Sequence, residues 1–192
     1  MAKLIGLNKI KTAVFISGTG SNLKNLINFS KTKKSPISID LIISNTIKAK
    51  GLKYSNQYKI KKKILNLKNI RIAEKRLLNL LKQNKIQFIC LAGFMKILSS
   101  KFIKQFNGKI INIHPSLLPR YKGLNTHSRA IQNKDKFTGC SVHYVTEQLD
   151  SGKIILQKKI KILKKDTPKS LAKKVLKQEH KLYPKAILKI FN

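Results

Sequence analysis

The sequence predicts a single α/β domain with a mostly parallel, Rossmann-like sheet and helices on both faces. Short apolar runs typical of buried strands alternate with helical patterns along almost the whole chain. The chain has 192 residues, of which 42% are hydrophobic, so it is large enough to bury a substantial core. Neither an internal repeat nor a linker divides it. We therefore expect residues 12–192 to form one domain after an N-terminal extension, residues 1–11.

The first half of the chain predicts three strands and three helices. Strands are indicated by the apolar run 12–16, by residues 37–44, which alternate and then become apolar, and by the short run 62–65. A glycine turn at 17–22 precedes a helical spacing of apolar residues. A short helix is expected at 49–57, and residues 72–81 carry apolar side chains along one helix face.

The second half predicts four strands and two helices. The run 86–91 is apolar throughout, as in a strand buried on both faces. A short helix ends at Phe106 and is followed by a strand that ends at His114. Two more strands, 138–145 and 153–160, flank the turn 149–152, and a helix over 168–190 closes the chain. Strands that alternate with helices imply right-handed parallel crossovers.

The net charge is strongly positive, with 42 Lys and Arg against 7 Asp and Glu, or +35. Such a charge can indicate a nucleic-acid-binding protein. However, the lysines are spread over the whole length, Trp is absent, and the sequence shows no base-stacking motif of the RNA-recognition type. A composition bias explains this better, so we expect no specific nucleic acid as a partner. A positive surface would still attract phosphorylated or polycarboxylate substrates.

The cysteines and most of the histidines indicate neither a metal site nor a redox site. Cys90 and Cys140 lie far apart without metal or redox spacing, and buried thiols are the simpler interpretation. His127, His143 and His180 form no metal-binding pattern, and a structural role is favoured for each. The start of the chain lacks a signal-peptide core, and no apolar run approaches a membrane span. We expect a cytoplasmic protein with no metal and no membrane partner.

The segment 112–123, Asn-Ile-His-Pro-Ser-Leu-Leu-Pro-Arg-Tyr-Lys-Gly, carries the clearest chemical signal. Asn112 and His114 are two residues apart at the end of a strand, so they share one face, while Ile111 and Ile113 face the core. Pro115 then ends the strand. An amide and an imidazole at an open strand end can donate hydrogen bonds to an oxyanion, and the imidazole can also move a proton. A capped strand with a surface histidine is the alternative.

The glycine turn at 18–23 predicts a phosphate site. Backbone N–H groups at the start of a helix attract anions. The turn lacks the third glycine of the dinucleotide fingerprint, so we expect a phosphate monoester and no nucleotide cofactor. A side chain at Gly20 is expected to occupy the space that the phosphate needs. Alternatively, the turn is structural, and Ser21 or Asn22 caps the helix.

Asp150 lies in a tight Leu-Asp-Ser-Gly turn, where an aspartate is common for purely local reasons. The alternative is that its carboxylate pairs with His114 and raises the pKa of that imidazole toward the working range. The two residues are 36 positions apart, so the sequence leaves both interpretations open.

Six segments together resemble the phosphoribosylglycinamide formyltransferase family of folate-dependent enzymes. In family order, they are residues 16–23, 91–98, 112–119, 138–145, 149–157 and 178–184. The resemblance covers nearly the whole domain and implies a formyltransferase fold. It also implies an enzyme of de novo purine biosynthesis that transfers a formyl group from the co-substrate 10-formyltetrahydrofolate to the amine of glycinamide ribonucleotide. The implied partners are these small molecules, for a chain that is a monomer or a homodimer.

The resemblance also implies roles for individual residues, here grouped by the ligand that each would serve. The catalytic residues would be Asn112, His114 and Asp150. The ribonucleotide would be bound by Gly20, Ser21, Asn22, Pro115 and Glu179. The folate would be bound by Arg71, Met95, Lys96, Ile97, Leu98 and Asn112. Lys96 stands where many relatives have Arg, so a contact through this side chain would be a point charge rather than a fork.

Three alternatives remain at the level of sequence. Methionyl-tRNA formyltransferase shares the His-Pro-Ser-Leu-Leu-Pro core but has an additional tRNA-binding domain. Formyltetrahydrofolate hydrolase has an additional N-terminal regulatory domain. We expect neither, because this chain has room for neither. The third alternative is a basic nucleic-acid-binding protein on an inactive scaffold, which would show steeply salt-dependent binding.

Overall fold

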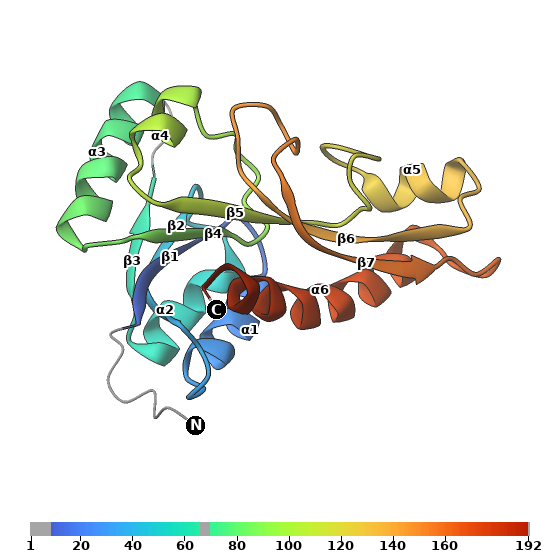
Figure 1. Ribbon diagram of the computed structural model, residues 1–192, viewed down its shortest axis with the longest axis horizontal. Helices are drawn as coiled ribbons and strands as arrows, with labels where there is room; N and C mark the ends of the chain where they lie inside the picture. The colour runs from blue at the N-terminus through green and yellow to red at the C-terminus, as the bar shows by residue number, and fades with distance from the viewer. Residues whose placement is uncertain (1–8, 66–69, 192) are drawn as a thin grey trace.

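The computed structural model describes residues 9–65 and 70–191. Figure 1 shows the arrangement of its helices and strands. In chain order they are β1 (Ile10–Ile16), α1 (Ser21–Ser30), β2 (Ile37–Ser44), the 3₁₀ helix η1 (Lys50–Leu52), α2 (Lys53–Tyr58), β3 (Lys61–Ile64), α3 (Ile70–Gln83), β4 (Phe88–Leu91), α4 (Ser100–Gln105), β5 (Lys109–His114), α5 (Thr126–Gln132), β6 (Phe137–Tyr144), β7 (Ile154–Lys161) and α6 (Pro168–Phe191).

The seven strands form one sheet in the order β3-β2-β1-β4-β5-β6-β7. The first five are parallel, whereas β6 and β7 are antiparallel to their neighbours. The mostly parallel sheet is therefore confirmed. The strand order reverses on either side of β1, and the carboxyl ends of β1 and β4 meet there. Ligands of open α/β sheets bind at such a point.

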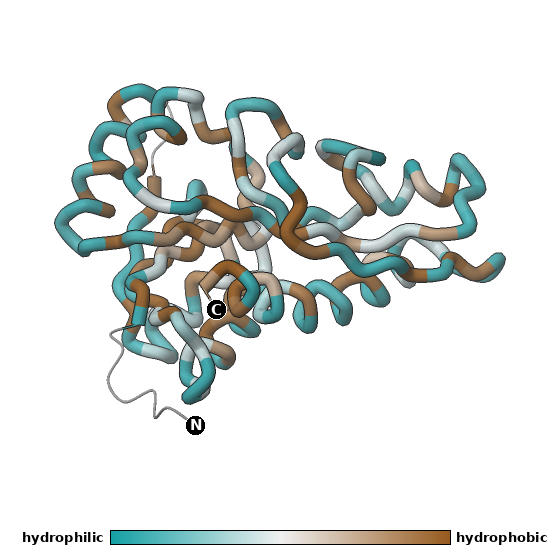
Figure 2. The backbone as a smooth tube through the Cα atoms, viewed as in Figure 1, coloured by the Kyte–Doolittle hydropathy of each residue, from teal (hydrophilic) through white to brown (hydrophobic). Residues whose placement is uncertain are grey.

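Helices cover both faces of the sheet, as the sequence predicts (Figure 1). Alternation along β1 separates two cores. Val14 and Ile16 face one core with residues of α1 and α6, while Ala13 and Phe15 face the other with residues of α3 and α4. The hydrophobic segments of Figure 2 accordingly concentrate along the central strands. Apolar side chains therefore pack against both faces of the central strands β1 and β4.

The predicted elements are confirmed, with small shifts at their ends. β1 begins at Ile10, so the last two residues of the predicted extension 1–11 belong to the sheet, while residues 1–8 lie outside the described part. α5 was not predicted. It has seven residues, of which Thr126 and Ala130 are buried. So short a helix has almost no apolar periodicity to detect and depends on tertiary packing.

Candidate active site

A cleft of about 1000 Å³ lies at the carboxyl ends of the central strands. Its walls come from the loop after β1, the loop after β4, the end of β5 and the segment between β6 and β7. Most of the site residues expected from the sequence line it: Ser21, Asn22, Met95, Lys96, Ile97, Leu98, Asn112, His114, Pro115, Asp150 and Glu179. Gly20 and Arg71 are not among the described residues that do.

The strand β5 delivers Asn112 and His114 to the cleft as its pattern predicts. Ile111 and Ile113 face the core and are 0% and 5% exposed. β5 pairs with β6 so that Asn112 stands opposite His143. After His114 the chain leaves the sheet through Pro115, which also lines the cleft. Because alternate side chains of a strand face opposite sides, β5 buries Ile111 and Ile113 in the core and presents Asn112 and His114 to the cleft.

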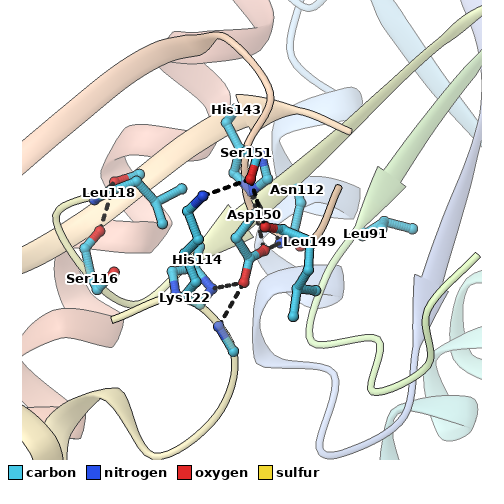
Figure 3. Close-up of polar contacts among 12 residues, drawn as sticks. Leu91, Asn112, His114, Ser116, Leu118, Lys122, His143, Leu149, Asp150 and Ser151 are labelled. Atoms are coloured by element: carbon cyan, nitrogen blue, oxygen red, sulfur yellow. Dashed lines mark hydrogen bonds and ion pairs between the residues drawn. The ribbon is translucent and has the colours of Figure 1, made fainter. Parts of the chain in front are cut away.

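Asp150 reaches the same place from the turn between β6 and β7 (Figure 3). Its Oδ2 atom lies 3.3 Å from Nδ1 of His114 and accepts a hydrogen bond of 2.9 Å from the backbone N–H of Gly123. Its Oδ1 atom accepts a longer bond, 3.4 Å, from the side-chain amide of Asn112. The carboxylate therefore contacts both residues of the β5 pair, as the second interpretation of Asp150 requires.

The shape of the turn supports this placement. Asp150 has a φ of 47°, a left-handed conformation that Asp tolerates better than most residues. Gly152 follows at a point where a Cβ atom would lie 1.8 Å from the carbonyl oxygen of Tyr144. A glycine is required there, because any side chain would push the two arms of the turn apart. The Leu-Asp-Ser-Gly residues therefore form a tight turn and also orient the carboxylate of Asp150 toward His114.

His143 is a site residue that sequence reasoning missed, since a structural role was favoured for it. Its side chain is 2% exposed. Its Nε2 atom lies 3.3 Å from the Asn112 amide nitrogen and 3.5 Å from Oδ1 of Asp150. Its Nδ1 atom lies 2.8 Å from the carbonyl oxygen of Tyr144. Alternation along β6 could have indicated which face of the strand His143 occupies. The pairing of β6 with β5, which brings His143 next to Asn112, is visible only in the tertiary structure.

The pKa values of His114 and Asp150 both lie below their ordinary values, but for different reasons. Burial lowers the pKa of His114, although the Tyr121 carbonyl, 2.8 Å from Nε2, and the Asp150 carboxylate both favour the charged form. Burial alone would raise the pKa of Asp150, but hydrogen bonds from His143 and Gly123 bring it below its ordinary value. The expectation that Asp150 raises the pKa of His114 is correct for that one contact and wrong for the net shift.

These surroundings define what His114 can do. Both of its ring nitrogens face oxygen acceptors, so the imidazolium would satisfy both of them, while burial favours the neutral ring. The lowered pKa of His114 favours the neutral imidazole, and the ionised carboxylate beside it can stabilise an incoming proton. Such a pair can hold a proton briefly during a reaction.

A second polar group lies at the amino end of α1. The Asn22 amide nitrogen donates a 2.7 Å hydrogen bond to Oε2 of Glu179 on α6, and both side chains are 7% exposed. Burial raises the pKa of Glu179, and the bond from Asn22 opposes this effect. Among the described residues, Oδ1 of Asn22 has no hydrogen-bond partner. These side chains and Ser21 form one end of the cleft.

Gly20 is required for a reason other than the expected one. Its φ is +74°, and a Cβ atom would lie 2.6 Å from the Cα atom of Gly51 in η1. A side chain would therefore strike the backbone of η1 and would not enter the space for a phosphate. Gly20 lets the loop after β1 adopt a left-handed turn against η1, and it presents Ser21 and Asn22 to the cleft.

The segment Met95–Leu98 forms a more apolar part of the cleft wall. Met95 and Ile97 are each 64% exposed. Backbone hydrogen bonds hold the segment at its first residue and at the residue that follows its last. The backbone N–H of Met95 donates to the Ser17 hydroxyl at 2.7 Å, and the backbone N–H of Ser99 donates to Oε1 of Glu74 on α3 at 2.8 Å. The Ser17 contact joins the loops after β1 and β4.

The structure supports the predicted folate contact of Lys96 but not that of Arg71. Lys96 lines the cleft and is exposed, so its ammonium group can reach a ligand. Arg71 is exposed near the start of α3, one turn before Glu74, and does not line the cleft. The placement therefore does not support the expected contact of Arg71 with folate.

The described part of the chain also bears on metal ligation, thiol chemistry and membrane spans. Within residues 9–65 and 70–191, no group of three or more His, Cys, Asp or Glu side chains is placed to hold a metal ion. Cys90 and Cys140 are buried free thiols, and burial raises the pKa of Cys140 to about 12. No described helix is long and apolar enough to cross a membrane.

A family profile described as formyl transferase matches residues 10–187, and the chain belongs to that family. Within it, the chain is similar to phosphoribosylglycinamide formyltransferase of Haemophilus influenzae. The two are 40% identical over 180 residues, which cover 92% of this chain and 85% of the relative. The crystal structure of the Brucella melitensis enzyme of the same name superposes with a TM-score of 0.90 at 39% identity, over 95% of this chain and 96% of that one.

The chain also resembles part of a longer protein. It is 42% identical over 182 residues to the human trifunctional purine biosynthetic protein adenosine-3. The match covers 93% of this chain but 18% of that protein, so the chain spans about a fifth of the length of such relatives.

Proposed function

We propose that this chain transfers a formyl group from 10-formyltetrahydrofolate to the amine of glycinamide ribonucleotide, in de novo purine biosynthesis. The observation that carries the proposal is the meeting of Asn112, His114 and Asp150 at one point of the cleft (Figure 3). The names of the relatives that the chain matches over nearly their full length agree with it. The enzyme would act in the cytoplasm, as a monomer or a homodimer.

The chemistry requires an oxyanion to be stabilised. The substrate amine attacks the formyl carbon directly, and the carbonyl oxygen becomes negative. The Asn112 amide nitrogen carries two hydrogens and makes only long contacts, 3.3 and 3.4 Å, to His143 and Asp150. It can therefore turn a hydrogen toward the new oxyanion, and the protonated His114 would donate to the same oxygen by turning its Nε2–H from the Tyr121 carbonyl toward the cleft.

The reaction also moves a proton from the attacking amine to the leaving nitrogen of the folate. His114 is neutral at rest, so it can accept this proton, and Asp150 stabilises the imidazolium that results. The carboxylate stays ionised throughout, because its pKa is low. Neither a covalent intermediate nor a metal ion is needed for this sequence of steps.

The two ends of the cleft would hold the two reactants. Ser21 and the turn that Gly20 makes possible would bind the phosphate at the amino end of α1, with Asn22, Glu179 and Pro115 around the ribosyl group. The exposed apolar segment at Met95, Lys96, Ile97 and Leu98 would bind the pterin side of the folate. Holding both reactants in contact removes much of the entropic cost of reaction.

The test follows deformylation of 10-formyltetrahydrofolate by the purified chain, with and without glycinamide ribonucleotide. Turnover that requires the ribonucleotide supports the proposal. Deformylation without it would indicate a hydrolase, and no deformylation at all would overturn the assignment. His114→Ala and Asn112→Ala should each lower kcat by about 10²–10³, because an oxyanion donor acts mainly in the transition state. Asn28→Ala, at an exposed position on α1, is the matched control.

A further inference from the structure

The helices α1 and α6 lie side by side (Figure 1). Ser21 and Asn22 of α1 and Glu179 of α6 line the cleft. Two asparagines of α1, three residues apart and therefore on one face of the helix, reach consecutive residues of α6. Asn22 donates to the Glu179 carboxylate, and Asn25 donates to the backbone carbonyl of His180, each at 2.7 Å. Only the first of these contacts lies at the cleft.

The second contact exists because of a proline inside α6. In a regular helix the carbonyl of His180 would accept from the N–H of residue 184. Residue 184 is Pro184, which has no N–H, so the carbonyl is left without its helical donor. A partly buried carbonyl without a partner is costly. The side-chain amide of Asn25 supplies the missing hydrogen from a different helix.

We infer that Asn25 is a positioning residue for the ribonucleotide site and acts through the carbonyl that Pro184 frees. The bond from Asn25 to His180 fixes α6 against α1 at the residue next to Glu179. It thereby holds the Glu179 carboxylate at hydrogen-bond distance from Asn22, beside Ser21. This inference rests on the proposed function, because it assumes that Glu179 and Asn22 contact the ribonucleotide.

The joint itself can be tested without any activity, by a double-mutant cycle of melting temperatures. Asn25→Ala should lower Tm by about 3–8 °C in the natural background, because the His180 carbonyl loses its donor. In a Pro184→Ala background, residue 184 supplies an N–H, so the same change should lower Tm by less than about half as much. Equal losses in both backgrounds would overturn the proposed joint.

Kinetics then separate positioning from simple packing. Asn25→Asp keeps the size of the side chain but replaces the donor with an acceptor. It should raise KM for the ribonucleotide roughly three- to tenfold and leave KM for the folate and kcat within about twofold. The raised ribonucleotide KM should persist in the Asn25→Asp, Pro184→Ala double variant, because a new N–H at position 184 satisfies the His180 carbonyl without restoring the bond between α1 and α6. A ribonucleotide KM restored in that double variant would contradict the positioning role. Asn28→Asp is the control, at an exposed position on the same helix.

The outcomes also distinguish this inference from the proposed function. If the unaltered chain shows no ribonucleotide-dependent turnover, the proposed function fails, while the melting cycle still tests the joint. If the unaltered chain is active but Asn25→Asp changes both KM values equally, or neither, the positioning role is wrong and the reaction assignment stands.

Discussion

Replacement of Asp150 by Asn separates a turn residue from a participant in the chemistry. Asn has nearly the same shape and tolerates the same left-handed conformation, here a φ of 47°. Its side-chain oxygen can still accept from the backbone N–H of Gly123, as Oδ2 does now at 2.9 Å. The substitution therefore removes one negative charge beside His114 and leaves the turn almost unchanged.

The size of the effect follows from the geometry of the pair. The charged atoms are 3.3 Å apart, and both side chains are under a tenth exposed, at 6% and 7%. With an effective dielectric constant near 20, a full charge on each group gives an attraction of about 5 kcal/mol. Each ~1.4 kcal/mol of lost stabilisation slows a reaction tenfold. Without the charge of Asp150, the imidazolium formed during transfer is less stable, and the rate of transfer should fall by up to roughly 10³–10⁴. We expect kcat to fall by about 10²–10⁴ in Asp150→Asn.

The assay is the pH dependence of kcat/KM for ribonucleotide-dependent deformylation, with Tm measured in parallel. Burial lowers the pKa of His114 and Asp150 partly opposes this, so removal of the charge lowers that pKa further. The acid limb of the profile, which follows protonation of His114, should move to lower pH. Tm should change little. A normal rate with an unmoved acid limb would show that the carboxylate has no part in the chemistry.

Two other predictions concern stability. Gly20→Ala should lower Tm by about 3–10 °C, because φ is +74° and the new Cβ would meet the backbone of Gly51, whereas Gly18→Ala has open space and should leave Tm nearly unchanged. Equal melting temperatures for the two variants would contradict this account of the loop. The contribution of His114 and His180 to the free energy of unfolding should fall as the pH drops from about 7 to about 5. Burial lowers the pKa of His114 and His180 below 6.5, so their contribution is fully present above that value and is lost as the pH falls through the lowered values. Urea unfolding at several pH values measures this, and His180→Gln should flatten the slope; an unchanged slope would refute the assignment to that histidine.

The sequence by itself determined the order of the elements and one half of the candidate site. Apolar alternation locates the strands, and period two puts Asn112 and His114 on one face at a strand end that Pro115 terminates. The glycine turn before α1 is equally local, since its conformation depends on residues next to one another. These features are encoded within about ten residues, which is the range that periodicity and turn chemistry can report.

Only the tertiary structure decided which distant groups meet. The contact of Asp150 with His114 joins residues 36 positions apart, and the bond from Asn22 to Glu179 joins residues 157 positions apart. The function of Gly20 is likewise set by Gly51, a neighbour from another element. No local pattern contains these pairs. They depend on which strands are adjacent in the sheet and which helices pack on each face, and burial of the two apolar cores selects that arrangement for the whole chain at once.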